Sequence, residues 1–396
     1  MKLKNIHYGW VIIGAALILA LAAGLQNTLS LYVHPVTQEL GFSRGEFVFF
    51  RTLTMLTAAF LMPLFGRLST KYSIKKMALV GTTLNGLSLA ALGLAQNLWH
   101  FYAIGIFSGL VLNAGGFVII GILINRWFED KKATAMGIAF SGTGLGAAVM
   151  NPVSTCVINN FGWRNAFFFA GAVTLIIVIP TILLLIKDTP QEMGLQPYRE
   201  VNSKLDHQEK TITPKVIGMT YQEAKKTPKF WLLAIGVLCI SIIASAPNTH
   251  TVPYLIDMGY STGLASAVIT VCMIFQTIGK IGIGAMADKF GAMSVAIFFG
   301  ITSILVPVFA LGASNPISPW MIGTFMGLSS VGFSMTGNIF GNKFFGPKDF
   351  ASIFSRLSMI ATLGGGFAPP VMGMVFDLTG SYIRSWIALL VLAIVI

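Results

Sequence analysis

Long apolar runs, each close to the length of a membrane-crossing helix, alternate with short polar or Gly/Pro-rich breaks along nearly the whole chain. A helix needs about 20 apolar residues to cross a bilayer. The pattern therefore predicts twelve transmembrane helices, the last of them incomplete in a truncated chain, because its run holds only about 15 residues. The expected spans are 8–33, 45–66, 75–96, 99–125, 132–159, 164–186, 229–256, 262–286, 292–312, 318–343, 350–376 and 382–396.

The two halves of the chain repeat each other at a nearly constant offset. Shifting the sequence by 218 positions pairs residues of the same type across six spans. The pairs include Pro35 with Pro253, Gly66 with Gly284, Lys71 with Lys289, and Pro152 with Pro370. Parallel repeats of this kind are typical of transporters whose halves rock about a central site. We therefore expect two six-helix bundles, 1–187 and 229–396, joined by a polar cytoplasmic linker over 188–228.

Composition agrees with an all-α integral membrane protein. Of 396 residues, 55% are hydrophobic and only 10% are charged, whereas soluble proteins carry about 25% charged residues. The three cysteines lie within predicted spans and are predicted to be small packing residues.

The net charge of +12 is distributed unevenly. If the N-terminus is cytoplasmic, 20 of the 26 Lys and Arg residues fall in cytoplasmic segments, three in external loops and three within the membrane. Cytoplasmic loops of membrane proteins carry such an excess of basic residues. We expect a multi-pass protein of the plasma or inner membrane with both termini in the cytoplasm. Nucleic-acid binding is not needed to explain the basicity.

A glycine followed by an aspartate and a basic residue stands between spans 8 and 9, as Gly284, Asp288 and Lys289. The first-half copy has Gly66 and Lys71 but carries a threonine at position 70 where the acid is expected. These loops resemble the signature of the major facilitator superfamily. The resemblance implies the major facilitator fold, with the acid capping a neighbouring helix and latching one conformation. The threonine makes the first copy depart from that pattern.

Three segments narrow the resemblance. They are Tyr8-Gly9-Trp10-Val11, the stretch Lys226-Thr227-Pro228-Lys229-Phe230-Trp231, and residues 125–146, NRWFEDKKATAMGIAFSGTGLG. These segments are similar to the monocarboxylate transporter and oxalate/formate antiporter families. The resemblance implies alternating-access transport of a small organic anion, by exchange with a counter-anion or together with a proton. We expect a protein that functions as a monomer in the lipid bilayer.

Three cations lie inside predicted spans: Arg51, Lys280 and Arg356. A charge at the bilayer centre costs at least about 2.5 kcal/mol, so such residues commonly serve function. The resemblance implies that Lys280, four residues before the signature glycine, contacts the substrate carboxylate; relatives also place a lysine near Arg356. Snorkelling of these long side chains to the interface is the alternative. Arg51 could gate access from outside, anchor at the interface, or pair with Glu46.

Other polar positions are candidates for the same site. Asn113 could donate to a carboxylate or hydrogen-bond a neighbouring helix. His250, and His34 at the matching end of span 1, could couple proton movement or be ordinary interfacial histidines. Weaker candidates are Gln26, Asn27, Asn248 and Asn338.

All 14 acidic residues fall in loops or at the ends of spans. A proton-coupled sugar or drug carrier commonly uses an intramembrane carboxylate, so that class and cationic substrates are disfavoured. The sequence contains no cofactor-binding or metal-binding motif, and no nucleophile or acid–base group that predicts an enzyme. The principal hypothesis is a carrier of monocarboxylates or small dicarboxylates. The alternative is an exporter of neutral or amphiphilic compounds, which would give the three cations no role.

Overall fold

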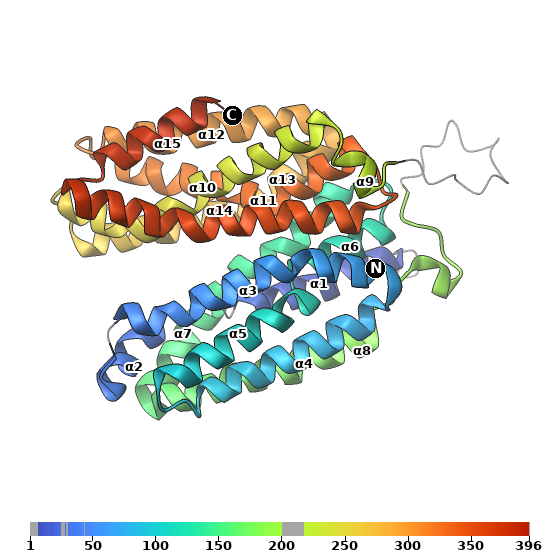
Figure 1. Ribbon diagram of the computed structural model, residues 1–396, viewed down its shortest axis with the longest axis horizontal. Helices are drawn as coiled ribbons and strands as arrows, with labels where there is room; N and C mark the ends of the chain where they lie inside the picture. The colour runs from blue at the N-terminus through green and yellow to red at the C-terminus, as the bar shows by residue number, and fades with distance from the viewer. Residues whose placement is uncertain (1–6, 25–27, 29–30, 43, 200–217, 396) are drawn as a thin grey trace, which may run out of the picture.

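The computed structural model describes residues 7–24, 28, 31–42, 44–199 and 218–395. Long helices run side by side and form two bundles, one from each half of the sequence (Figure 1). The first bundle contains α1 Tyr8–Gly24, α2 Val33–Leu40, α3 Arg44–Lys71, α4 Ile74–Leu92, α5 Leu98–Gly115, α6 Phe117–Trp127, α7 Lys132–Val173, the π-helical turn Thr174–Val178 and α8 Ile179–Leu185. This is the predicted all-α, two-bundle architecture of twelve spans.

The second bundle is regular. It contains α10 Pro228–Asp257, α11 Thr262–Phe290, α12 Ala292–Leu311, α13 Ser318–Phe345, α14 Phe350–Thr379 and α15 Ile383–Val395. The part of the linker that is described holds a 3₁₀ turn, Pro190–Met193, and the short helix α9, Tyr221–Ala224. We call the end of the molecule that holds α9 the linker side and the opposite end the distal side (Figure 1).

Within the described residues, the first bundle departs from the predicted spans at one break. The helix α1 is described as far as Gly24, and α2 begins at Val33; residues 25–27, 29 and 30 of the predicted first span lie outside the described parts. Span 4 is divided into α5 and α6 at Gly116, whose backbone is extended (φ −100°, ψ −155°). The hydrophobic pattern alone does not reveal the break at Gly116, because apolar residues lie on both sides of it.

Spans 5 and 6 follow each other within the helical stretch from Lys132 to Leu185. The bend between them lies at Gly162, where φ is 83°, a value that favours glycine. Lys132 lies on the linker side, and the carbonyl of Leu185 accepts a hydrogen bond there from Tyr8 at the start of α1 (3.0 Å). The stretch therefore crosses the molecule twice.

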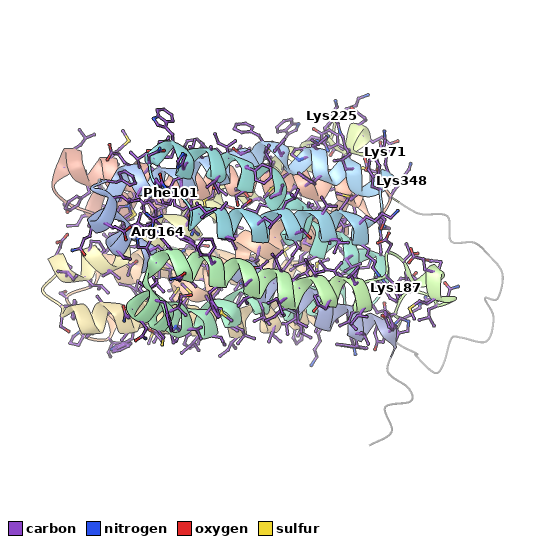
Figure 2. The ribbon with its side chains drawn as sticks, turned by 90° about the horizontal axis from the view of Figure 1, so that it is seen from below. Lys71, Phe101, Arg164, Lys187, Lys225 and Lys348 are labelled. Atoms are coloured by element: carbon purple, nitrogen blue, oxygen red, sulfur yellow. The ribbon has the colours of Figure 1, made fainter. Side chains whose placement is uncertain are left out.

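Seven helices of the described chain are long and apolar enough to cross a membrane, judged by length and composition, and α1 and α15 are apolar but shorter. Basic side chains concentrate at one end of this bundle. Figure 2 shows Lys71, Lys187, Lys225 and Lys348 at the linker side, with Arg164 toward the opposite end. The protein is thus a multi-pass membrane protein with a strongly basic linker side.

Small residues let helices approach each other closely within the first bundle. A Cβ added to Gly24 would lie 2.6 Å from the carbonyl oxygen of Thr143, and one added to Gly142 would lie 2.5 Å from that of Leu17. Gly146 approaches the backbone of Leu21 in the same way. Close backbone packing through small residues is typical of membrane helices. It fixes α7 against α1 and leaves the other face of α7 to meet the second bundle.

Candidate functional site

A cavity of about 1030 Å³ opens between the two bundles on the distal side. Its walls come from α2, α3 and α7 of the first half and from α10 and α11 of the second. Most of the lining is apolar, but it includes the polar side chains of Arg51, Asn151, Asn248, Gln276 and Thr277. A site formed by both bundles can change shape when the bundles move relative to each other.

Lys280 follows the cavity-lining residues Gln276 and Thr277 along α11 and is 4% exposed. Its Nζ donates to Thr143 Oγ1 of the opposite bundle at 2.7 Å. The Thr143 hydroxyl in turn donates to the carbonyl of Phe140 at 2.9 Å, so it acts as the acceptor for the lysine. Above this pair, Gly144 approaches the Thr277 hydroxyl closely, and both residues line the cavity. Lys280 therefore crosses between the bundles rather than snorkelling to the surface.

The charge of Lys280 has no carboxylate beside it. Within the described chain no acidic oxygen lies within ion-pair distance of its Nζ, and Thr143 is a neutral partner. An ammonium group has three donors, of which the hydroxyl uses one. A buried charge without a counter-charge is costly. The geometry thus leaves two donors of a buried cation for a further acceptor.

Arg356 lies on α14 near the linker side, away from the distal cavity, and is 8% exposed. Its guanidinium carbon stands 3.6 Å from the centre of the Tyr221 ring, which belongs to α9. Its Nη1 donates to the carbonyl of Ser352 at 2.6 Å. The prediction that it contacts substrate together with Lys280 is not tested by this arrangement, but in this conformation an aromatic ring covers the guanidinium.

Arg51 on α3 contributes to the wall of the distal cavity and is partly exposed. Of the three intramembrane cations, it is the one whose side chain lines this cavity. That position is compatible with the predicted access role. An interfacial anchor would place it equally well, so the role stays a prediction.

Asn113 and His250 form hydrogen bonds inside their own bundles. The Asn113 amide donates to the carbonyl of Ala58 on α3 at 2.6 Å, in a buried position. The His250 ring lies between the Tyr382 hydroxyl (3.1 Å from Nδ1) and the Pro369 carbonyl (2.9 Å from Nε2). The Asn113 bond joins two helices, as in the structural alternative given for it, whereas the His250 ring is held inside the second bundle. The substrate and proton-coupling roles of these residues stay predictions.

Of the weaker candidates, Asn248 lines the distal cavity and Asn338 is buried near the linker side. Residues 26 and 27 and the side chain of His34 lie outside the described parts of the structure. The three cysteines are free, and in the described chain no group of histidine, cysteine and acidic side chains could hold a metal ion.

On the linker side, α7 and α11 close the space between the bundles. A Cβ added to Gly137 of α7 would overlap the carbonyl oxygen of Lys280, and one added to Gly284 of α11 would overlap that of Ala133. The two helices therefore touch backbone to backbone over about one turn. We call this region the α7–α11 contact. It separates the distal cavity from a second cavity of about 980 Å³ on the linker side.

Asp288 adds hydrogen bonds to the α7–α11 contact. Its Oδ2 accepts from the backbone N–H of Thr134 at 2.7 Å, and its Oδ1 from that of Ala133 at 3.2 Å. Both N–H groups belong to the first turn of α7, where the helix itself supplies no acceptor. A carboxylate is also favoured at a helix N-terminus by the helix dipole. An acid of the second bundle thus caps a helix of the first.

The equivalent contact between α3 and α14 is built differently. Gly66 approaches Ser355 and the carbonyl oxygen of Ala351, so the close backbone approach is kept. At the position of the acid, however, the Thr70 hydroxyl donates to Arg67 O of its own helix at 2.7 Å. The α3–α14 contact therefore lacks a side-chain cap from Thr70.

The linker supplies another connection at this place. The backbone N–H of Tyr221 donates to Asp349 Oδ2 at the start of α14 (2.9 Å), while the Tyr221 ring covers Arg356. A capping box between Thr220 and Glu223 begins α9. These hydrogen bonds from Thr220 hold the pKa of the exposed Glu223 below its ordinary value. Lys71 is exposed, and Lys289 lies 5.2 Å from the centre of the Phe290 ring; neither joins the bundles.

A sequence model of the Major Facilitator Superfamily matches residues 15–342, most of the chain. The chain belongs to the Major Facilitator Superfamily. This facilitator is 24% identical over 371 residues to the oxalate:formate antiporter of Oxalobacter formigenes, across 90% of this chain and 83% of the relative. It is 24% identical over 396 residues to Monocarboxylate transporter 11 of Mus musculus, across 96% of this chain and 84% of the relative. The resemblances drawn from the loop signature and the three segments are confirmed.

The fold of this facilitator agrees with a solved structure. The crystal structure of the E. coli fucose:proton symporter FucP superposes with a TM-score of 0.69 at 14% sequence identity, over 98% of both chains. The similarity confirms the twelve-helix facilitator fold. Together with the relatives it identifies the protein as a facilitator-family transporter related to monocarboxylate and oxalate:formate carriers.

Sequence reasoning missed three residues that bear on the site of this facilitator. Thr143 lies within the segment 125–146, but nothing marks it as the partner of Lys280. Gln276 stands one helical turn before Lys280, and its polarity within an apolar span was an available signal. Tyr221 lies in the linker, and no periodicity connects it with Arg356.

Proposed function

We propose that this facilitator carries small organic anions, monocarboxylates or small dicarboxylates, and that Lys280 binds the carboxylate of the cargo. The single observation that carries the proposal is the geometry of Lys280: a buried ammonium between the bundles, with a hydroxyl as its hydrogen-bond partner and no acid within ion-pair distance among the described residues. A carboxylate supplied by the cargo would compensate that charge. The names of the two relatives, an oxalate:formate antiporter and a monocarboxylate transporter, support the same class of cargo.

We place the linker side in the cytoplasm. The excess of basic residues on that side supports this orientation, because cytoplasmic loops of membrane proteins are enriched in Lys and Arg. The distal cavity then faces outward, and the α7–α11 and α3–α14 contacts close the cytoplasmic side. Both termini are cytoplasmic in this arrangement.

Transport requires the closed contacts to open. In our account an anion enters the distal cavity and displaces the Gly144–Thr277 contact above Lys280. It then binds the free donors of the ammonium group. Rocking of the bundles breaks the Asp288 cap and the glycine contacts, and the anion leaves on the linker side. Asp288 and Gly284 act as the conformational latch, with Gly66 in the corresponding position of the other contact.

The experiment is uptake of radiolabelled lactate, formate and oxalate into proteoliposomes that contain the purified protein. Lys280→Met is compared with Lys289→Met, which removes an exposed lysine of the same helix. We expect competition by carboxylates in the parent protein, loss of at least tenfold in uptake for Lys280→Met, and little change for Lys289→Met. Equal uptake by both variants, or competition by neutral compounds alone, would contradict the proposal and favour an exporter of neutral compounds.

The same vesicles show whether anion uptake is coupled to a counter-anion or to a proton. Preloading with unlabelled anion accelerates uptake if the protein exchanges anions, whereas an imposed pH gradient accelerates it if a proton accompanies the anion. We expect His250→Gln to leave exchange intact, because its ring bonds Tyr382 and Pro369 inside the second bundle. A loss of the pH-driven component alone in this variant would assign the proton to His250.

A further inference from the structure

The orientation of one amide in the distal cavity is fixed by its neighbours. The Ser330 hydroxyl donates its single hydrogen to the carbonyl of Gly327 at 2.7 Å. Its oxygen also accepts from the Gln276 amide nitrogen at 2.7 Å. Gln276 thus turns its NH₂ group toward Ser330. Its oxygen Oε1 has no hydrogen-bond donor in the described protein, and the residue lines the cavity.

Asn248 is oriented in the same manner. Its Nδ2 lies 2.8 Å from the carbonyl oxygen of Ala244, which can only accept, so the NH₂ group must be at that end. Its Oδ1 likewise has no donor in the described protein, and Asn248 lines the same cavity as an exposed side chain. Two amides of the second bundle, on α10 and α11, thus have acceptor oxygens left for a ligand.

Lys280 supplies the complementary chemistry on the same helix. It stands four residues after Gln276 on α11, so the two residues are neighbours on one face of that helix. A ligand whose carboxylate binds the Lys280 ammonium can therefore place a hydroxyl group near the Gln276 oxygen. An anion that also carries a hydrogen-bond donor satisfies both groups.

We infer that the distal cavity selects hydroxylated carboxylates, with Gln276 and Asn248 as specificity-determining acceptors for the hydroxyl group of a cargo whose carboxylate binds Lys280. The inference rests on the proposed function and narrows its substrate class. A hydroxyl group donates to Gln276 Oε1 or Asn248 Oδ1. A second carboxylate or a keto oxygen can only accept, so it leaves these oxygens desolvated and without a donor.

An amino group would also donate to these oxygens. However, no acidic side chain lines the distal cavity in the described residues, so an ammonium group would lose its hydration without gaining a counter-charge. The cavity therefore favours the neutral donor of a hydroxy acid over the cationic donor of an amino acid.

The test measures selectivity rather than activity. Uptake of labelled glycolate into proteoliposomes is competed with unlabelled acetate, glycolate, glyoxylate or glycine. The inhibition constant of each competitor is divided by that of glycolate, and the value for acetate is the glycolate-to-acetate ratio. We expect glycolate to compete about tenfold better than acetate and glyoxylate, the difference that one satisfied hydrogen bond of about 1.4 kcal/mol gives. Lactate against propionate and pyruvate repeats the comparison with one more carbon.

Two variants assign the effect to the amide. Gln276→Met keeps the length of the side chain and removes the acceptor, and should reduce the glycolate-to-acetate ratio to near one while acetate still binds. Ser330→Ala frees Gln276 to turn either end toward the cavity and should reduce the ratio by a smaller amount. Ile274→Met, in the wall of the same cavity and on the same helix, removes no hydrogen-bonding atom and should keep the ratio.

The outcomes separate this inference from the proposed function. If carboxylates are carried but hydroxylated and non-hydroxylated anions compete equally, the hydroxyl selectivity is wrong and the proposed function stands. The same holds if Gln276→Met keeps the parent ratio, or if glycine competes better than glycolate. If no carboxylate is bound or carried by the parent protein, the proposed function itself fails.

Discussion

The α7–α11 and α3–α14 contacts occupy equivalent places in the two repeats, yet they are held together by different chemistry. Both keep a glycine that allows two backbones to touch, Gly284 in one and Gly66 in the other. The first adds a carboxylate, Asp288, that caps the opposing helix. The second has Thr70 at that position and connects instead to the linker through Tyr221.

The difference shows how a repeated architecture can lose its symmetry at one residue. The offset of 218 pairs Asp288 with position 70, and pairs the capped N–H groups of Ala133 and Thr134 with those of Ala351 and Ser352 at the start of α14. The backbone arrangement is therefore present in both contacts. We propose that the α7–α11 contact is the principal latch of the closed linker side, and that α9 reinforces the weaker one.

The largest effect is expected when the glycine contact itself is broken. Gly137→Leu places a side chain against Lys280 O, and overpacking of this kind costs about 1–3 kcal/mol. The distal-open state should then be depopulated by roughly 5- to 150-fold. The measurement is alkylation of a cysteine introduced at Met273, in the distal cavity, in a background without the three native cysteines.

Gly282→Leu is the matched control for that experiment. Gly282 lies on α11, two residues from Gly284, and a Cβ there meets no atom within 4 Å. Its alkylation rate should equal that of the parent protein. If both glycine variants label at the parent rate, the α7–α11 contact does not hold the linker side closed.

Removal of the cap should have a smaller effect. Asp288→Ala leaves two first-turn N–H groups of α7 without their acceptor, and loss of a helix cap costs about 1 kcal/mol. We expect about fivefold slower alkylation of the distal cysteine. Thr70→Ala, at the equivalent position, should change the rate by less than twofold. An equal effect of the two variants would contradict the asymmetry.

The next smaller effect on the alkylation rate is expected from the contact between Tyr221 of the linker and Arg356 of α14. Tyr221→Ala removes the ring over Arg356, an interaction of about 0.5–1 kcal/mol because the ring itself is half-exposed. Tyr221→Phe keeps the ring and should behave like the parent protein. The same labelling assay compares the two. If Tyr221→Phe is as impaired as Tyr221→Ala, the hydroxyl group rather than the ring carries the effect.

The smallest expected effect is an increase in the population of the distal-open state. Thr70→Asp restores the acid in the first repeat, near the first-turn amides of Ala351 and Ser352, where a carboxylate is worth about 0.3–1 kcal/mol. It should raise alkylation of the distal cysteine and slow transport slightly, because the closed linker side becomes harder to open. Faster transport in this variant would show that the α3–α14 contact is not limiting.

The fold could be predicted from the sequence almost completely, because membrane helices are encoded by the length and composition of continuous runs. The break at Gly116 could not, since apolar residues lie on both sides of it. The cap by Asp288 followed from the superfamily signature. The binding site was harder to predict than the fold. Cations within apolar spans can be recognised by residue type. That Lys280 contacts a hydroxyl depends on how the helices are rotated, and that Arg356 contacts an aromatic ring depends on a linker without hydrophobic periodicity.

The central claim is that the cargo compensates the charge of Lys280, and thermal unfolding of the purified protein tests it most directly. Lys280→Met removes a buried charge that has a neutral partner only, so without anion it should unfold at the parent temperature or above. We predict that glycolate, lactate or oxalate raises the unfolding temperature of the parent protein and of Lys289→Met, and leaves that of Lys280→Met unchanged. Equal stabilisation of Lys280→Met by the same anion would contradict the account.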